Sequence, residues 1–139
     1  MTQTSRVLYT ARAHTTGGRE GASHTDDNRL SVALSNPGTS ATGTNPEQLF
    51  AVGWSACFLS ALQLIAAKQK IVFSAPPSDD VEVDLQLSKE DGFSLRVRHN
   101  LTLPGVDSDT ARMLVEEGHR TCPYSKATHG NIEVENRIL

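Results

Sequence analysis

Two cysteines are the residues of this chain that are best suited to do chemistry. Cys57 lies within a long apolar segment, and Cys122 begins the motif Cys-Pro-Tyr-Ser. They form no C-x-x-C pair, and two cysteines are too few for a thiolate zinc cage. Because residues 1–6 lack the pattern of a signal peptide, we expect a reducing cytoplasmic setting, where structural disulfides are rare. The thiols are therefore either reactive or inert and buried, and composition alone favours an inert Cys57.

A cysteine reacts as its thiolate, and the position of Cys57 does not favour that anion. It is expected in the middle of a helix, where burial disfavours the charge and the helix dipole gives no help. Cys57 would therefore need a nearby cation, and Arg19 on a glycine-rich loop is the best candidate. A carboxylate such as Glu47 could hold that guanidinium through a bidentate pair. The spacing permits this arrangement but does not require it.

Cys122 has the opposite character. Because Pro123 suits the first position of a helix, Cys122 is expected to be the N-cap, where backbone N–H groups favour a thiolate. On local electrostatics alone, Cys122 would be the attacking thiol. Cys-Pro-Tyr-Ser is also similar to the thioredoxin motif without its second cysteine, but no βαβ pattern precedes it.

The elements that must position these residues form an α+β pattern. Alternating apolar and polar residues indicate strands, and longer periodic segments indicate helices. Residues 15–23 are expected to be a loop, and the 139 residues to form a single domain, 1–139. The expected elements are strands over 7–14 and 30–34, a helix from its N-cap Asn45 to about Lys68 or Lys70, a hairpin of 81–87 and 93–103, a helix over 108–119, a helical turn after Cys122, and a strand over 132–138.

The long central helix predicts a homodimer. It is apolar on nearly all sides, which is more surface than one small domain can cover, although sheets of the same chain are the alternative cover. Glu47 and Cys57 share a face but lie about 15 Å apart along a straight helix. They would meet only in a composite site between two copies, or around a bend at Gly53. The stripe on this face consists of Glu47, Phe50, Trp54, Cys57, Ala61 and Leu64.

Several classes of function are disfavoured by composition. The net charge is −3 and the basic residues are scattered, so no nucleic-acid surface is expected. Polar residues interrupt the apolar segment 49–67, which favours a helix buried in protein over a membrane span. The five histidines show no metal-binding spacing, and no cofactor motif is present.

Four motifs stand in order along almost the whole chain. They are Thr16-Gly17-Gly18-Arg19, Asn45-Pro46-Glu47-Gln48-Leu49-Phe50-Ala51, Ala56-Cys57-Phe58, and Cys122-Pro123-Tyr124-Ser125 followed by Ala127-Thr128 and Gly130-Asn131-Ile132. The glutamate of the second motif stands ten residues before the cysteine of the third. Each motif is short, but their combination is specific, and it resembles the organic hydroperoxide resistance proteins, the Ohr branch of the Ohr/OsmC family.

The resemblance implies an intertwined homodimer, with two long central helices flanked by β-sheets. It also implies a thiol peroxidase that reduces organic hydroperoxides, including those of fatty acids, to alcohols. Cys57 would be the peroxidatic thiol and Cys122 the resolving one, which reverses the choice made on local electrostatics. Arg19 would activate the thiolate and the peroxide, and Glu47 would orient Arg19. Lipoylated proteins, rather than thioredoxin or glutathione, would supply the reducing dithiol.

Three residues depart from the family pattern: Trp54 stands where tyrosine is common, and Lys126 and His129 where asparagine and arginine are common. The aromatic residues Phe50, Trp54 and Phe58 could line an apolar entrance for bulky peroxides, or simply pack in the core. Two alternatives remain open. The protein could be an OsmC-type peroxidase with broader substrate use, or a dimer that binds ligands or senses oxidants without turnover.

Overall fold

The computed structural model describes residues 4–139. Their contacts divide the chain into two compact units, one ending at Pro46 and the other running from Glu47 to Leu139. The sequence predicts one domain over 1–139.

The N-terminal unit contains a three-stranded antiparallel sheet in the order β1-β2-β3. Its strands are β1 (Ala13–Thr16), β2 (Ala22–Thr25) and β3 (Ser31–Ala33), and a short 3-10 helix, η1 (Gly18–Glu20), connects the first two. Gly17 and Gly18 both have positive φ angles, of 75° and 59°, which favour glycine. A Cβ on Gly21 would lie 1.7 Å from the carbonyl oxygen of Thr16, so the loop closes too tightly for any side chain there.

Two expectations for this unit are wrong. The strand expected over 7–14 is limited to its last two residues, which begin β1, and residues 7–12 form no strand. A strand needs a hydrogen-bonded neighbour along its length, and among the described residues of this unit only the carbonyl of Arg12 has one, which accepts from the N–H of Asp26 at 3.1 Å. The segment 15–23, expected to be a loop throughout, also contains the end of β1 and the start of β2. The third strand, β3, pairs with β2. Because β2 reads Ala-Ser-His-Thr, it lacks the apolar alternation by which a strand is recognised.

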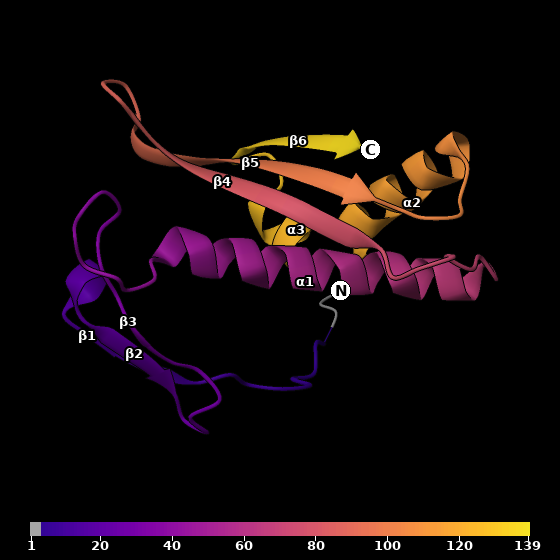
Figure 1. Ribbon diagram of the computed structural model, residues 1–139. Coiled ribbons are helices and arrows are strands. Elements are labelled where there is room, and N and C mark those ends of the chain that lie inside the picture. Colours follow the sequence, from indigo (N-terminus) through magenta and orange to yellow (C-terminus); the bar gives the residue numbers. More distant parts are fainter. Residues whose placement is uncertain (1–3) are drawn as a thin grey trace. The chain divides into compact units, whose positions relative to one another are not determined.

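The second unit places the long helix α1 (Pro46–Lys68) along a three-stranded sheet (Figure 1). The strands β4 (Ser78–Ser88) and β5 (Gly92–Thr102) form the expected antiparallel hairpin. The last strand, β6 (Glu133–Ile138), pairs with β5 in parallel, from Arg96 to Leu101. The parallel pairing requires a crossover, which is made by the two helices α2 (Ser108–Thr121) and α3 (Pro123–Thr128).

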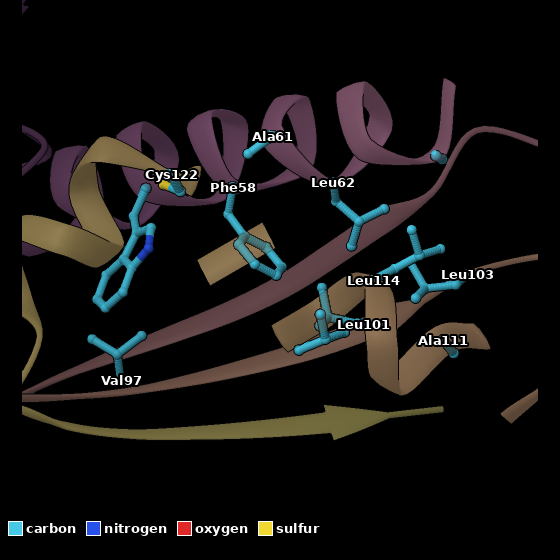
Figure 2. Close-up of a cluster of buried hydrophobic side chains, with 12 residues drawn as sticks. Phe58, Ala61, Leu62, Val97, Leu101, Leu103, Ala111, Leu114 and Cys122 are labelled. Carbon is cyan, nitrogen blue, oxygen red and sulfur yellow. The ribbon is translucent and has the colours of Figure 1, made fainter. Parts of the chain in front are cut away.

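The core of this unit lies between α1, α2 and the sheet. Figure 2 shows Phe58 and Leu62 of α1 directed into the same cluster as Leu101 of β5 and Leu114 of α2. All four side chains are fully buried. Cys122, which separates α2 from α3, is buried in the same cluster.

Only one face of α1 is covered by its own unit. Val52 and Leu64 are 68% and 50% exposed, whereas Trp54 on the covered face is 1% exposed. The helix is long and apolar enough to cross a membrane, with a mean hydropathy of 1.8 in its most apolar window. Core helices of globular proteins share this property, and α1 carries its buried face against a sheet, as such a helix does.

Candidate active site

The two cysteines meet, although they belong to distant segments of the chain. Cys57 lies on α1, and Cys122 lies between α2 and α3. Their thiols are neighbours, close enough for each to affect the other's ionisation, and no disulfide joins them. Packing of α1 against the end of α2 brings the thiols together, so both sulfurs belong to one site.

The two thiols differ in exposure. Cys57 is half-buried, whereas Cys122 has no exposed surface. A peroxide arriving from solvent can therefore reach Cys57 first. This difference favours Cys57 over Cys122 as the attacking thiol, in spite of the position of Cys122 at the N-terminus of a helix.

The surroundings of Cys57 disfavour its thiolate. Burial raises the pKa of the Cys57 thiol, and the adjacent thiol of Cys122 raises it further. The backbone N–H of Tyr124 donates a hydrogen bond to Cys57 and lowers this pKa, but the net direction is upward. The second unit by itself therefore holds a neutral thiol, as the mid-helix position of Cys57 predicts, and activation requires a cation.

Cys122 is the N-cap of α3, with Pro123 at its first position, as the sequence predicts. Its side chain makes no capping hydrogen bond to the helix. The backbone of Cys122 instead holds α2 and α3 together: its N–H donates to the carbonyl of Gly118 at 2.8 Å, and its carbonyl accepts from Lys126 at 3.0 Å.

Tyr124 packs directly over α1 at Gly53. A Cβ at Gly53 would lie 3.0 Å from the phenol oxygen of Tyr124, so glycine is what allows this close approach. The ring of Tyr124 also contacts Phe50, with 6.3 Å between ring centroids. The residue that donates its N–H to Cys57 is thus anchored on the same helix as Cys57.

A chain of hydrogen bonds connects α1, α3, α2 and β6 beside the thiols. The indole Nε1–H of Trp54 donates to the hydroxyl of Ser125 at 3.0 Å. The same hydroxyl lies 2.7 Å from Nδ1 of His119, and Nε2 of His119 lies 2.7 Å from Oδ1 of Asn136. Because Oδ1 only accepts, Nε2 of His119 carries the proton, and Nδ1 accepts from Ser125.

His119 is held neutral at the centre of this chain. Burial lowers its pKa, and the nearby ring of His99 lowers it further. The hydrogen bond to Asn136 and the charge of Asp79 act in the opposite direction but do not reverse the shift. His119 also stacks on Phe58, with 4.2 Å between ring centroids.

A second polar pair is buried beneath this chain. Nδ1 of His99 lies 2.6 Å from Oδ2 of Asp79, and both side chains are completely buried. Nε2 of His99 and Oδ1 of Asp79 have no hydrogen-bond partner among the described residues. The His99 ring meets the indole of Trp54 edge-on, with 4.8 Å between centroids, so the pair belongs to the packing around Trp54.

The sequence also singles out Arg19 and Glu47. Arg19 is half-buried on η1 in the N-terminal unit, and Glu47 is half-buried in the first turn of α1. Arg19 belongs to one unit and Glu47 and Cys57 to the other, so the approach of Arg19 to Cys57 and its pairing with Glu47 stay predictions.

The three aromatic residues expected near the substrate differ in exposure. Phe58 is fully buried and Trp54 is 1% exposed, whereas Phe50 is half-buried and contacts Tyr124. Phe58 therefore has a packing role in this unit, and Phe50 is the one that offers surface beside the thiols. Their part in binding a substrate stays a prediction.

A cavity of about 640 Å³ is lined by Trp54 and by residues of α2, α3 and β6. Trp54, Lys126 and His129, the three residues expected to depart from the Ohr pattern, line it. Neither cysteine lines it. Ser125, Thr128, Gly130 and Ile132 of the fourth motif line it, but the other lining residues come from α1, α2 and β6, so the motif alone does not indicate a cavity.

A helix packed on a mixed sheet, with one half-buried and one fully buried thiol in contact, defines a two-cysteine α+β protein.

Residues 38–137 match the family model described as OsmC-like protein. The chain is 42% identical to the organic hydroperoxide resistance protein of Xanthomonas axonopodis pv. citri, over 96% of each chain. It is 39% identical to the organic hydroperoxide resistance protein OhrA of Bacillus subtilis, over 94% of this chain and 95% of OhrA. The crystal structure of Bacillus subtilis OhrB superimposes with a TM-score of 0.90 at 37% identity, covering 96% of this chain and 100% of OhrB.

The chain belongs to the OsmC-like family, in its organic hydroperoxide resistance branch. The resemblance found in the four sequence motifs is confirmed, and so is the α+β fold with helices packed on β-sheets.

Proposed function

We propose that the protein is a thiol peroxidase that reduces organic hydroperoxides, including those of fatty acids, to alcohols. The observation that carries the proposal is the contact between the only two cysteines of the chain, one of them half-exposed and the other buried. Two thiols in contact can close a disulfide without unfolding the segments that carry them. The relatives named organic hydroperoxide resistance proteins support the choice of oxidant.

In the proposed reaction, the Cys57 thiolate attacks the distal oxygen of the hydroperoxide. An S–O bond forms, the O–O bond breaks, and the departing alkoxide takes up a proton to leave as an alcohol. Cys57 is then a sulfenic acid, which condenses with the thiol of Cys122 to give a disulfide and one water molecule. An external dithiol reduces the disulfide by thiol–disulfide exchange and restores both thiols.

Arg19 is proposed to supply the cation that this cycle needs. The raised pKa of Cys57 means that little thiolate is present unless a positive charge lies beside it. A guanidinium remains charged at all relevant pH values and can also donate hydrogen bonds to the peroxide oxygens. Glu47 would orient Arg19, either within one chain or across a dimer.

A homodimer is proposed as the working form. The uncovered face of α1 exposes Val52 and Leu64, and the N-terminal unit exposes Val7, Leu8 and Tyr9 by about four-fifths each. Apolar surface of this kind commonly marks an interface between protein chains. We further propose a cytoplasmic protein without a bound cofactor, recycled by lipoylated protein or by dihydrolipoamide.

Intact mass and free-thiol counts after one equivalent of cumene hydroperoxide test the proposal. Wild type is expected to lose two hydrogens and two thiols, and dihydrolipoamide is expected to restore both. Cys122→Ser should retain one added oxygen on Cys57, and Cys57→Ser should not react. Oxidation of Cys122 in Cys57→Ser, at the rate of wild type, would reverse the two roles.

The same assay separates the alternatives. An OsmC-type peroxidase of broader range would turn over hydrogen peroxide about as well as cumene hydroperoxide. A redox sensor or a ligand-binding protein would be oxidised once, or not at all, and would show no multiple turnover with dihydrolipoamide.

A further inference from the structure

The cavity between α2, α3 and β6 lies entirely within the second unit and is separate from the thiols. Its volume of about 640 Å³ is in the range of small-molecule sites. We propose that this cavity binds an organic monoanion with an apolar body, such as a medium-chain carboxylate. It is a second site, independent of the peroxidase chemistry proposed above.

The polar groups at the inner end of the cavity are already used. Trp54 and Ser125 are its most buried lining residues, and their polar atoms bond to each other. His119 and Asn136 continue the same hydrogen-bond chain. Because these donors and acceptors satisfy one another, the inner end has little to offer a polar ligand and presents mainly the indole ring.

The walls are apolar, and the mouth carries charged side chains. Ile132 and Val134 are half-buried in the lining, whereas Arg120 and Lys126 are exposed at its edge. A ligand that fits both parts of the lining therefore has an apolar body, which lies inside the cavity, and a charged group, which lies at the mouth.

The sign of the ligand charge follows from the ion pairs at the mouth. Arg120 is paired with Glu117, one turn away on α2. Lys126 forms no ion pair within the described residues, although Glu116 also lines the cavity. With His119 held neutral, Lys126 is the positive charge left to meet a ligand anion.

Trp54 is the only tryptophan of the chain, so its fluorescence reports directly on the cavity. We would titrate the reduced full-length protein with octanoate, and in parallel with octylammonium and 1-octanol, which have the same alkyl chain and a different head. Octanoate should change the Trp54 emission saturably, and the other two should bind at least about tenfold more weakly. Lys126→Gln should weaken octanoate binding by about tenfold, while Lys89→Gln, at the exposed turn after β4, should leave it unchanged.

Amide chemical shifts provide a second measurement that does not depend on the variants. Octanoate is expected to shift the signals of Ile132, Val134 and Lys126 and to leave that of Cys57 nearly unchanged. The proposal is overturned if all three probes bind alike, which would indicate partition onto exposed apolar surface. It is also overturned if Lys126→Gln binds octanoate as wild type does, or if the largest shifts lie around Cys57 and Phe50. None of these outcomes bears on the peroxidase assay, so the two proposals can fail separately.

Discussion

The indole of Trp54 and the hydroxyl of Ser125 are joined by a 3.0 Å hydrogen bond that connects the helix carrying Cys57 to the short helix that follows Cys122. Both side chains are at least nine-tenths buried. The bond is therefore shielded from water, and it fixes α3 on α1 close to the two thiols.

Replacing this hydroxyl should affect both stability and disulfide formation. Ser125→Ala leaves the buried indole N–H of Trp54 without an acceptor, which is expected to lower the free energy of unfolding by about 1–3 kcal/mol. Looser attachment of α3 should also slow condensation of the Cys57 sulfenic acid with Cys122. Urea unfolding and stopped-flow oxidation measure the two effects. Ser94→Ala, at an exposed position of β5, serves as the control, and equal stability of the two variants would contradict the prediction.

Two helical glycines provide a matched comparison of close packing. A Cβ at Gly118 would lie 2.9 Å from Cε1 of Phe58, which is fully buried and cannot move away. Gly118→Ala is therefore expected to destabilise the protein by about 1–3 kcal/mol.

At Gly53 the neighbour is Tyr124, which is 41% exposed and can shift outward. The strain in Gly53→Ala should be offset by the better helix propensity of alanine, about 1 kcal/mol, so that stability changes little. Because Tyr124 donates its N–H to Cys57, the oxidation rate of Gly53→Ala should change even so. Thermal unfolding of both variants tests the contrast, and a larger loss at Gly53 than at Gly118 would contradict it.

The elements with strong local patterns were predictable from the sequence. The helix expected from Asn45 to about Lys68 is α1, and the expected hairpin is β4 and β5. The observed β4 is longer than expected at both ends, and β5 begins and ends one residue earlier than expected. Proline, asparagine and glycine at the ends of these elements, with regular apolar spacing inside them, provided the signal.

The site was predictable only in part, because most of it depends on contacts between distant segments. Local electrostatics selected Cys122, and nothing in the spacing shows that its thiol touches Cys57. The family resemblance indicated the pair, whereas no pattern indicated the hydrogen-bond chain through Ser125 and His119. That chain draws one residue from each of four elements, and although Trp54 and Ser125 belong to the motif regions, nothing in the sequence shows that they meet His119 and Asn136.

Removal of the proposed activating cation should slow the first oxidation step. Arg19→Gln is expected to lower the rate of Cys57 oxidation by cumene hydroperoxide by about 10²–10³-fold at neutral pH, as for loss of a charge-stabilising donor. Without the guanidinium the Cys57 pKa stays raised, so the variant should recover part of its rate as the pH increases. Stopped-flow rates between pH 6 and about 10 test this. Arg29→Gln, whose arginine is exposed and paired with Asp27, is the control, and a similar loss in both variants would refute a specific role of Arg19.

Acid should destabilise the fold through His119. Its pKa is lowered in the folded protein, because burial favours the neutral ring, relative to about 6.5 in the unfolded chain. A depressed pKa means that the stabilisation is fully present above the unfolded value and is lost as the pH falls toward the folded value. The free energy of unfolding is therefore expected to decrease when the pH falls from about 7.5 to about 5.

The variant His119→Gln tests whether His119 causes the loss of stability in acid. Glutamine does not titrate and can still form a hydrogen bond to Ser125 or to Asn136. Urea unfolding at both pH values should show a smaller loss of stability in acid for this variant than for wild type, even if the variant is less stable overall. His129→Gln, at an exposed position in the mouth of the cavity, should keep the wild-type dependence. If His119→Gln retained the full acid effect, the assignment of that effect to His119 would be refuted.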